Sequence, residues 1–415
     1  MKLQQRNNID LMAPGGSYES LSAAIQAGAN SVYFGIEKLN MRARSSNNFT
    51  FEDLENIVNI CNQNNVKTYL TVNTIIYDNE IETMHRVVDA AAKSKVTAII
   101  ASDISVIKYA IDNGVKVHAS TQLNITNIEA VKFYSQFCDV IVTARELSLE
   151  QVKEITTKIK ERNITGPSGE LVKIEIFCHG ALCMAVSGKC YLSLHEYNSS
   201  ANRGACLQIC RRGYKVTDLE TDAELKIENQ YIMSPKDLCT ISFINKIIES
   251  GVSVLKIEGR ARSAEYVKTV VECYNQAIKS YFDDKYTAEK INKWKEQLST
   301  VFNRGFWNGY YLGQRLGEWS EVYGSKATKT KIYLGKVLNY FSNIGVAEIK
   351  LETAEELSVN DEILFLGPTT GVVQQFATEI RENMQTTDKV VQGALFSIKT
   401  DELVRRGDKL YKLKE

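Results

Sequence analysis

The sequence is short of several residue types and patterns, and each shortage argues against a class of function. It has four histidines in 415 residues and contains neither an H-E-x-x-H zinc helix nor a G-x-S-x-G nucleophile elbow, which counts against the common hydrolase sites. Its 50 Lys and Arg balance 50 Asp and Glu, which argues against nucleic-acid binding driven by bulk charge. No segment approaches the ~20 consecutive apolar residues of a membrane helix, so we expect no membrane partner.

The first residues, MKLQQRNNIDLMAP, lack the apolar core of a secretory signal peptide. We therefore expect a cytoplasmic protein. In a reducing compartment, nine cysteines are better explained as ligands, catalysts or packed side chains than as disulfides, and an odd number fits a disulfide framework poorly.

Short apolar runs alternate with amphipathic helical patterns over the first ~260 residues, which is typical of parallel βαβ units. Eight such runs predict an α/β fold, a TIM-like (β/α)8 barrel occupying residues 1–330. Residues 331–415 contain short strand patterns separated by turn residues, which predict a small C-terminal β-barrel domain. The expected barrel strands are 9–13, 31–35, 67–72, 97–101, 115–119, 139–143, 172–177 and 253–257.

Polar residues gather where the expected barrel strands end, which is where (β/α)8 barrels carry their active sites. Arginines there can hold phosphate or a dicarboxylate by bidentate contacts, and a glutamate or histidine can transfer protons. The substrate-binding candidates are Arg42, Arg44, Asn73, Gln122, Arg145 and Arg262, and the catalytic candidates are Glu258, Arg260 and His179.

Five cysteines between residues 183 and 239 fall in an insertion of about residues 178–240, between the seventh strand and an expected helix at 236–250. Thiolates are soft ligands that suit zinc, copper or an iron–sulfur cluster. Only Cys206-x3-Cys210 has the spacing of a zinc knuckle, and the wider gaps match neither common ferredoxin pattern, so the spacing leaves zinc and iron–sulfur both open. The candidate metal ligands are Cys183, Cys190, Cys206, Cys239 and Cys210.

The other notable residues are better explained by packing. Cys61, Cys138 and Cys273 lie in regular apolar patterns, as free cysteines in cores often do. The aromatic cluster that contains Trp307 and Tyr310 is more often a buried cap than a platform on which bases stack.

Several segments resemble the signatures of the collagenase-like, U32-type peptidase family. They are LMAPGG at 11–16, EIFCHGALCMAVSGKCYLS at 175–193, NRGACLQICRR at 202–212, SPKDLC at 234–239 and KIEGR at 256–260. The resemblance covers nearly the whole chain. It implies a [4Fe-4S] cluster held by Cys183, Cys190 and Cys206, with either Cys239 or Cys210 as the fourth ligand and a slight preference for Cys239.

The resemblance also implies a function, because better-understood branches of the family resemble hydroxylases. The length here looks most like the branch that forms 5-hydroxyuridine at the tRNA wobble position, with prephenate as co-substrate. The expected partners are therefore tRNA and a small anionic co-substrate, and the sequence does not indicate the electron donor. Hydroxylation of another RNA or of a quinone-like aromatic molecule is an alternative.

A peptidase is the other alternative, as the family name says. It would need a Cys–His pair such as Cys178 with His179. Adjacent residues of a strand point to opposite faces, which counts against that pair.

Overall fold

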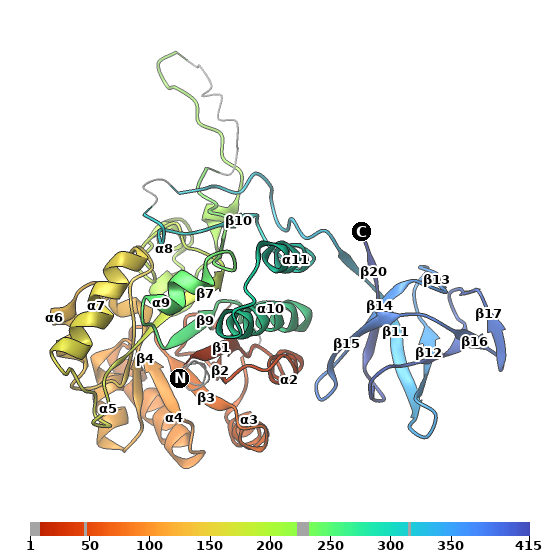
Figure 1. The fold of residues 1–415 in the computed structure, drawn as a ribbon, viewed down its shortest axis with the longest axis horizontal. Coiled ribbons are helices and arrows are strands. Elements are labelled where there is room, and N and C mark those ends of the chain that lie inside the picture. The colour runs from red at the N-terminus through yellow and green to blue at the C-terminus, as the bar shows by residue number, and fades with distance from the viewer. Residues whose placement is uncertain (1–8, 45–47, 222–231, 314–316) are drawn as a thin grey trace.

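The computed structural model describes residues 9–44, 48–221, 232–313 and 317–415. Eight parallel strands form a closed barrel: β1 pairs with β2 and β9, and β9 also pairs with β7 (Figure 1). The expected (β/α)8 fold is therefore confirmed. The barrel strands are β1 (Asp10–Pro14), β2 (Ser31–Phe34), β3 (Lys67–Val72), β4 (Ala98–Ala101), β5 (Val117–Ala119), β6 (Val140–Val142), β7 (Lys173–Gly180) and β9 (Val254–Ile257).

Helices follow most of these strands and cover the outside of the barrel, and side chains close their N-termini. Thr50 and Asp53 form a reciprocal capping box at the start of α3, and Ser148 and Gln151 form another at α7, which satisfies backbone N–H groups that the helix leaves unbonded. In the described part of the chain, no helix combines the length and apolarity needed to cross a membrane. The helices are α2 (Tyr18–Gln26), α3 (Phe51–Gln63), α4 (Ile81–Lys93), α5 (Ile104–Asp112), α6 (Ile128–Tyr134), α7 (Leu149–Glu161), α9 (Ile244–Glu249), α10 (Ala264–Phe282) and α11 (Ala288–Ser299).

The insertion after β7 ends differently from the expectation. The helix predicted at 236–250 is wrong in its first half, where β8 (Asp237–Cys239) pairs antiparallel with the end of β7 and parallel with β10 (Phe306–Trp307). Only α9 is helical. The partner strand β10 lies about seventy residues later in the chain. Local periodicity contains no information about such a distant pairing, so it could not predict this strand. Earlier in the insertion lie α8 (Leu192–Tyr197) and two short 3₁₀ turns.

The C-terminal part forms an antiparallel sheet with its own apolar core, beside the barrel (Figure 1). Its edge strands β15 and β17 do not pair with each other within residues 330–415, so the sheet is not closed by hydrogen bonds. It contacts the barrel through α2, where Gln26 Nε2 donates to Thr370 O at 2.6 Å. Its strands are β11 (Thr330–Phe341), β12 (Val346–Leu351), β14 (Glu362–Gly367), β15 (Gly371–Phe376), β16 (Ile380–Glu382), β17 (Gln385–Thr387), β19 (Leu395–Lys399) and β20 (Lys409–Lys414), with β13 (Leu357–Ser358) and β18 (Lys389–Val390) as a separate pair.

Candidate functional site

A cavity of about 180 Å³ opens at the carboxyl ends of the barrel strands, under the cysteine insertion. We call it the arginine cavity. Most of the sequence-predicted site residues line it, although they come from different strands and from the insertion. They are Arg42, Asn73, Gln122, Arg145, Glu258, Arg260 and Arg262, together with Cys183, Cys190, Cys206 and Cys210. Arg44, His179 and Cys239 do not line it.

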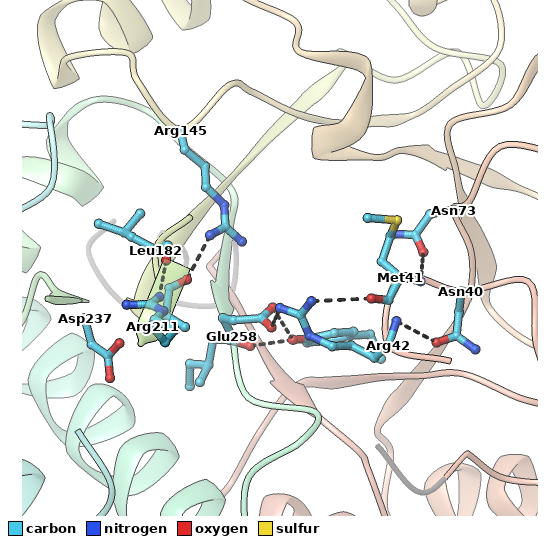
Figure 2. Close-up of polar contacts among 12 residues, drawn as sticks. Asn40, Met41, Arg42, Asn73, Arg145, Leu182, Arg211, Asp237 and Glu258 are labelled. Carbon is cyan, nitrogen blue, oxygen red and sulfur yellow. Dashed lines mark hydrogen bonds and ion pairs between the residues drawn. The ribbon is translucent and has the colours of Figure 1, made fainter. Parts of the chain in front are cut away.

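Glu258 lies directly after β9 and forms an ion pair with Arg42 in the cavity (Figure 2). Arg42 Nη2 donates to its Oε1 at 2.6 Å, and the hydroxyl of Tyr33 donates to Oε2 at 3.3 Å. Burial opposes ionisation of this carboxyl, but the positive charges of Arg42, Arg145 and Arg260 outweigh it and lower the pKa of Glu258 to about 2. Glu258 is therefore an anion at neutral pH, suited to positioning arginines rather than to giving up a proton.

Arg260 lies deeper, inside the mouth of the barrel. Its Nη1 donates to the Thr71 hydroxyl at 2.7 Å, and burial lowers the pKa of Arg260 to about 10, so it remains cationic at neutral pH. The guanidinium packs against the backbone of Gly35, where an added Cβ would lie 2.7 Å from Nη1. A glycine at this position leaves room for the arginine.

Arg145 reaches into the space between Arg211 and Glu258 (Figure 2). Its Nη1 donates to Ala181 O at 2.9 Å, and its guanidinium carbon lies 3.7 Å from the centre of the Phe177 ring. Its buried Nε has no hydrogen-bond partner, and the same is true of Gln122 Oε1 and Thr121 Oγ1. Buried polar atoms are rarely left unpaired, so this wall of the cavity has the character of a ligand-binding surface.

The cavity carries a strong excess of positive charge. Six cationic side chains line it, of which Arg42 is paired with Glu258 and Lys256 with Glu175. The remaining arginines leave a positive excess, so an anionic ligand is favoured. The cations are Arg42, Arg145, Arg211, Lys256, Arg260 and Arg262.

Four thiols of the insertion lie on the wall of the same cavity. Cys183 is exposed, and Cys190, Cys206 and Cys210 are partly buried. Burial raises the pKa of Cys210 to about 11, against the opposing charge of Arg211, and the three other cysteines are near enough to add to that rise. In the described residues, no three His, Cys, Asp or Glu side chains are placed to hold a single metal ion. The thiols are thus gathered, but not in the arrangement of a mononuclear site.

Cys239 is separated from that group. It lies buried in β8 beside Cys178, with the Tyr274 hydroxyl 4.0 Å from its sulfur. The slight sequence-based preference for Cys239 over Cys210 as fourth ligand therefore finds no support in the geometry, which places Cys210 with the other three.

Two further candidates also lie outside the cavity. His179 is buried among aromatic rings with Nδ1 3.3 Å from the Tyr274 hydroxyl, and burial lowers its pKa to about 3, so it is neutral. Arg44 Nη1 donates to the Ser199 hydroxyl at 3.0 Å and ties the loop after β2 to the insertion.

Residues 16–321 match the profile of Peptidase family U32. The chain belongs to this family.

The U32 relatives carry two kinds of name. A protein from Porphyromonas gingivalis named "Collagenase" is 62% identical over 98% of both chains. The "tRNA hydroxylation protein P1" of Bacillus subtilis is 33% identical over 86% of this chain and 83% of its own. The "23S rRNA 5-hydroxycytidine C2501 synthase" of Escherichia coli is 30% identical over 75% of this chain and 46% of its own.

Three residues of the site in this U32 protein are not among those predicted from the sequence. Tyr33 gives no signal, because a tyrosine is ordinary in a buried strand. Lys256 could have been found, since a lysine inside the apolar run of β9 is unusual; it pairs with Glu175 at 2.8 Å. Arg211 stands beside Arg212 in the sequence and gives no signal of its role, which is to donate to Leu182 O, Ser234 and Pro235 O and so fix the cysteine loop in place.

Proposed function

We propose that this protein is an RNA-modifying hydroxylase that forms 5-hydroxyuridine at the tRNA wobble position, with a [4Fe-4S] cluster and with prephenate as the anionic co-substrate. One observation carries the proposal: four cysteines of an irregular insertion and an arginine-rich cup at the barrel top line the same cavity. A soft-ligand site and an anion site therefore share one space.

Cys183, Cys190, Cys206 and Cys210 are the residues that would hold the cluster. Their donor chemistry fits such a group, because iron–sulfur clusters are held by cysteine thiolates, and these four thiols line one cavity and lie near one another. The bound cluster would supply electron transfer next to the cavity. Arg211 fixes the segment that carries Cys183 by donating to Leu182 O, and so positions the first ligand.

The arginines would bind the co-substrate. Prephenate carries two carboxylates, and arginine binds carboxylates through paired N–H donors. The carboxylate of Glu258 holds Arg42 in place at 2.6 Å, so this side chain of the arginine cavity is positioned before the ligand binds.

The relatives support an RNA substrate, since two of them are named for tRNA or rRNA hydroxylation. A wobble base is unpaired, so a protein can turn it into a pocket without opening a duplex. The zero net charge requires that RNA contacts be local.

Two measurements test the proposal. Anaerobically purified protein should contain about four irons and four sulfides per chain. Mass spectrometry of tRNA from a deletion strain should show no 5-hydroxyuridine derivatives. Stoichiometric zinc without sulfide would overturn the cofactor. Unchanged tRNA would overturn the substrate, and failure to bind tRNA at low salt would shift the proposal to a small aromatic substrate.

A peptidase is the second candidate, because the relative that is 62% identical is named "Collagenase". The cavity geometry favours it less. No histidine is among the described residues that line the arginine cavity, and burial raises the pKa of Cys178 well above its usual value. Cleavage of gelatin by cluster-loaded protein, lost in Cys178→Ala, would establish it.

A further inference from the structure

A second cavity, of about 200 Å³, lies beside the arginine cavity. We call it the tryptophan cavity, after the aromatic wall formed by Trp307, Tyr310 and Trp319. The cysteine-bearing segment 182–187 also lines it. We propose that the tryptophan cavity binds the pyrimidine base of the RNA substrate. This inference rests on the proposed function and deepens it, because it says where the base lies.

The aromatic wall is a built feature of the fold. The Trp307 and Tyr310 rings meet edge to face with centroids 5.0 Å apart. Trp319 is held opposite Pro235 by a backbone bridge, and both indoles approach Gly317, where an added Cβ would lie 3.7 Å from Trp319 and 3.8 Å from Trp307. Trp307 is buried, whereas Trp319 is 37% exposed at the edge. A planar ring that enters here can stack on Trp319, as bases do on aromatic side chains.

Three residues of this cavity carry a buried polar atom without a partner. They are Trp307 Nε1, Arg145 Nε and Thr121 Oγ1. The indole and guanidinium nitrogens can only donate, while the hydroxyl can donate or accept. A pyrimidine base presents two acceptors and one donor on its pairing edge, so the three atoms match it in number and kind.

The charges of the two cavities differ. The charged residues that line the tryptophan cavity are Arg145 and the exposed Glu146, which cancel, whereas the arginine cavity is strongly positive. The arginine cavity thus favours an anion and the tryptophan cavity a neutral ring. Arg145, Thr121 and Cys183 border both, so a base in one would lie next to the thiols and to a co-substrate in the other.

Photocrosslinking tests the location directly. The probe is an anticodon stem–loop RNA with 5-iodouridine at the wobble position, irradiated with cluster-loaded protein, and the adduct is mapped by peptide mass spectrometry. We expect it on Trp307, Tyr310 or Trp319. An adduct that maps to another part of the protein, or no preference over the same RNA with 5-iodouridine in its stem, would overturn the inference.

Matched tryptophan variants give a second readout, the dissociation constant for the unmodified stem–loop. Trp307→Phe keeps a buried ring but removes one donor, and should weaken binding about fivefold. Trp319→Ala removes the stacking surface and should weaken it about tenfold or more. Trp294→Phe is the control. Trp294 lies in α11 and its Nε1 donates to Gln276 Oε1 in α10 at 2.9 Å, away from both cavities, so this variant should bind RNA as the unaltered protein does.

The outcomes separate the inference from the proposed function. Crosslinking at the aromatic wall combined with unchanged tRNA in the deletion strain would support the cavity and overturn wobble hydroxylation. Lost hydroxylation in the deletion strain, with no binding change in either Trp307→Phe or Trp319→Ala, would do the reverse. If Trp307→Phe does not fold, the exposed Trp319 carries the binding test alone.

Discussion

The two groups of cysteines in this protein have the same side chain and opposite environments. Cys183, Cys190, Cys206 and Cys210 lie on irregular backbone and border the arginine cavity. The other five are buried within or beside regular elements. The backbone that carries a thiol, rather than the thiol itself, therefore separates candidate ligands from packed side chains.

The two groups of cysteines differ because one lies in or beside helices and strands and the other lies in the irregular insertion. A helix or strand places a cysteine in a packed layer, where a small apolar side chain is stabilising. The insertion instead turns at glycines with positive φ, and at Gly204 an added Cβ would lie 2.2 Å from Asn40 O. Those turns bring together thiols that are far apart in the sequence, against the polar end of the barrel.

The largest expected contrast is between one cysteine of each group. Cys206→Ser should reduce the iron content of anaerobically purified protein to a small fraction of its normal value and abolish tRNA hydroxylation, because a hydroxyl is a poor ligand for iron–sulfur clusters. Cys138→Ala should keep iron and activity, and lower the free energy of unfolding by about 1–2 kcal/mol. Iron analysis and urea denaturation check the pair. Equal iron loss in both variants would remove the distinction between the groups.

A sharper contrast compares Cys210 with Cys239. If the cavity defines the ligand set, Cys210→Ser loses the cluster, whereas Cys239→Ala keeps it and loses about 1–3 kcal/mol of stability from the packed site beside Tyr274. Visible absorption of the two proteins, measured under anaerobic conditions, shows which one still carries the cluster. Retention by Cys210→Ser with loss in Cys239→Ala would reverse the assignment.

Cys210 and Cys239 also show which features of the site can be predicted from the sequence. The eight strands, the insertion and most cavity residues follow from alternation and from polar residues at strand ends, for instance Glu258 and Arg260 after β9. The choice between Cys210 and Cys239 does not, because it depends on β8 folding back along β7, a pairing between distant segments. The same pairing made the helix predicted at 236–250 wrong. Local patterns therefore predict the barrel, and long-range contacts decide the arrangement on top of it.

Two carboxylates, Glu258 and Glu175, give a similar comparison, with a smaller expected effect on the free energy of unfolding. The folded-state pKa of Glu258 is about 2, below its usual value of 4.5. Its ion pair with Arg42 and the nearby charges of Arg145 and Arg260 therefore stabilise the protein above about pH 4.5, and this contribution is lost as the pH falls toward 2. The stability gap between the unaltered protein and Glu258→Gln should thus shrink over that range, by at most about 3 kcal/mol.

Glu175 should behave in the opposite way. Burial raises its pKa, against the nearby charge of Lys256, so protonation at low pH relieves a penalty. The free energy of unfolding of the unaltered protein should therefore rise relative to that of Glu175→Gln as the pH falls. Urea denaturation at several pH values measures both gaps, and parallel slopes for the two variants would contradict the assigned pKa directions.

The smallest contrast concerns two glycines that both have positive φ, at +76° for Gly188 and +71° for Gly114. Alanine at either position should cost about 1–2 kcal/mol, because a Cβ is disfavoured in the left-handed region. At Gly114 nothing lies within 4 Å of the added Cβ, whereas at Gly188 it would lie 2.3 Å from Gln122 Oε1, one of the unpartnered atoms of the arginine cavity. Gly188→Ala should therefore also weaken co-substrate binding several-fold, seen as a higher KM, while Gly114→Ala leaves KM unchanged. If both glycines affected stability alone, the wall between Cys183 and Cys190 would act as a scaffold rather than as part of the binding surface.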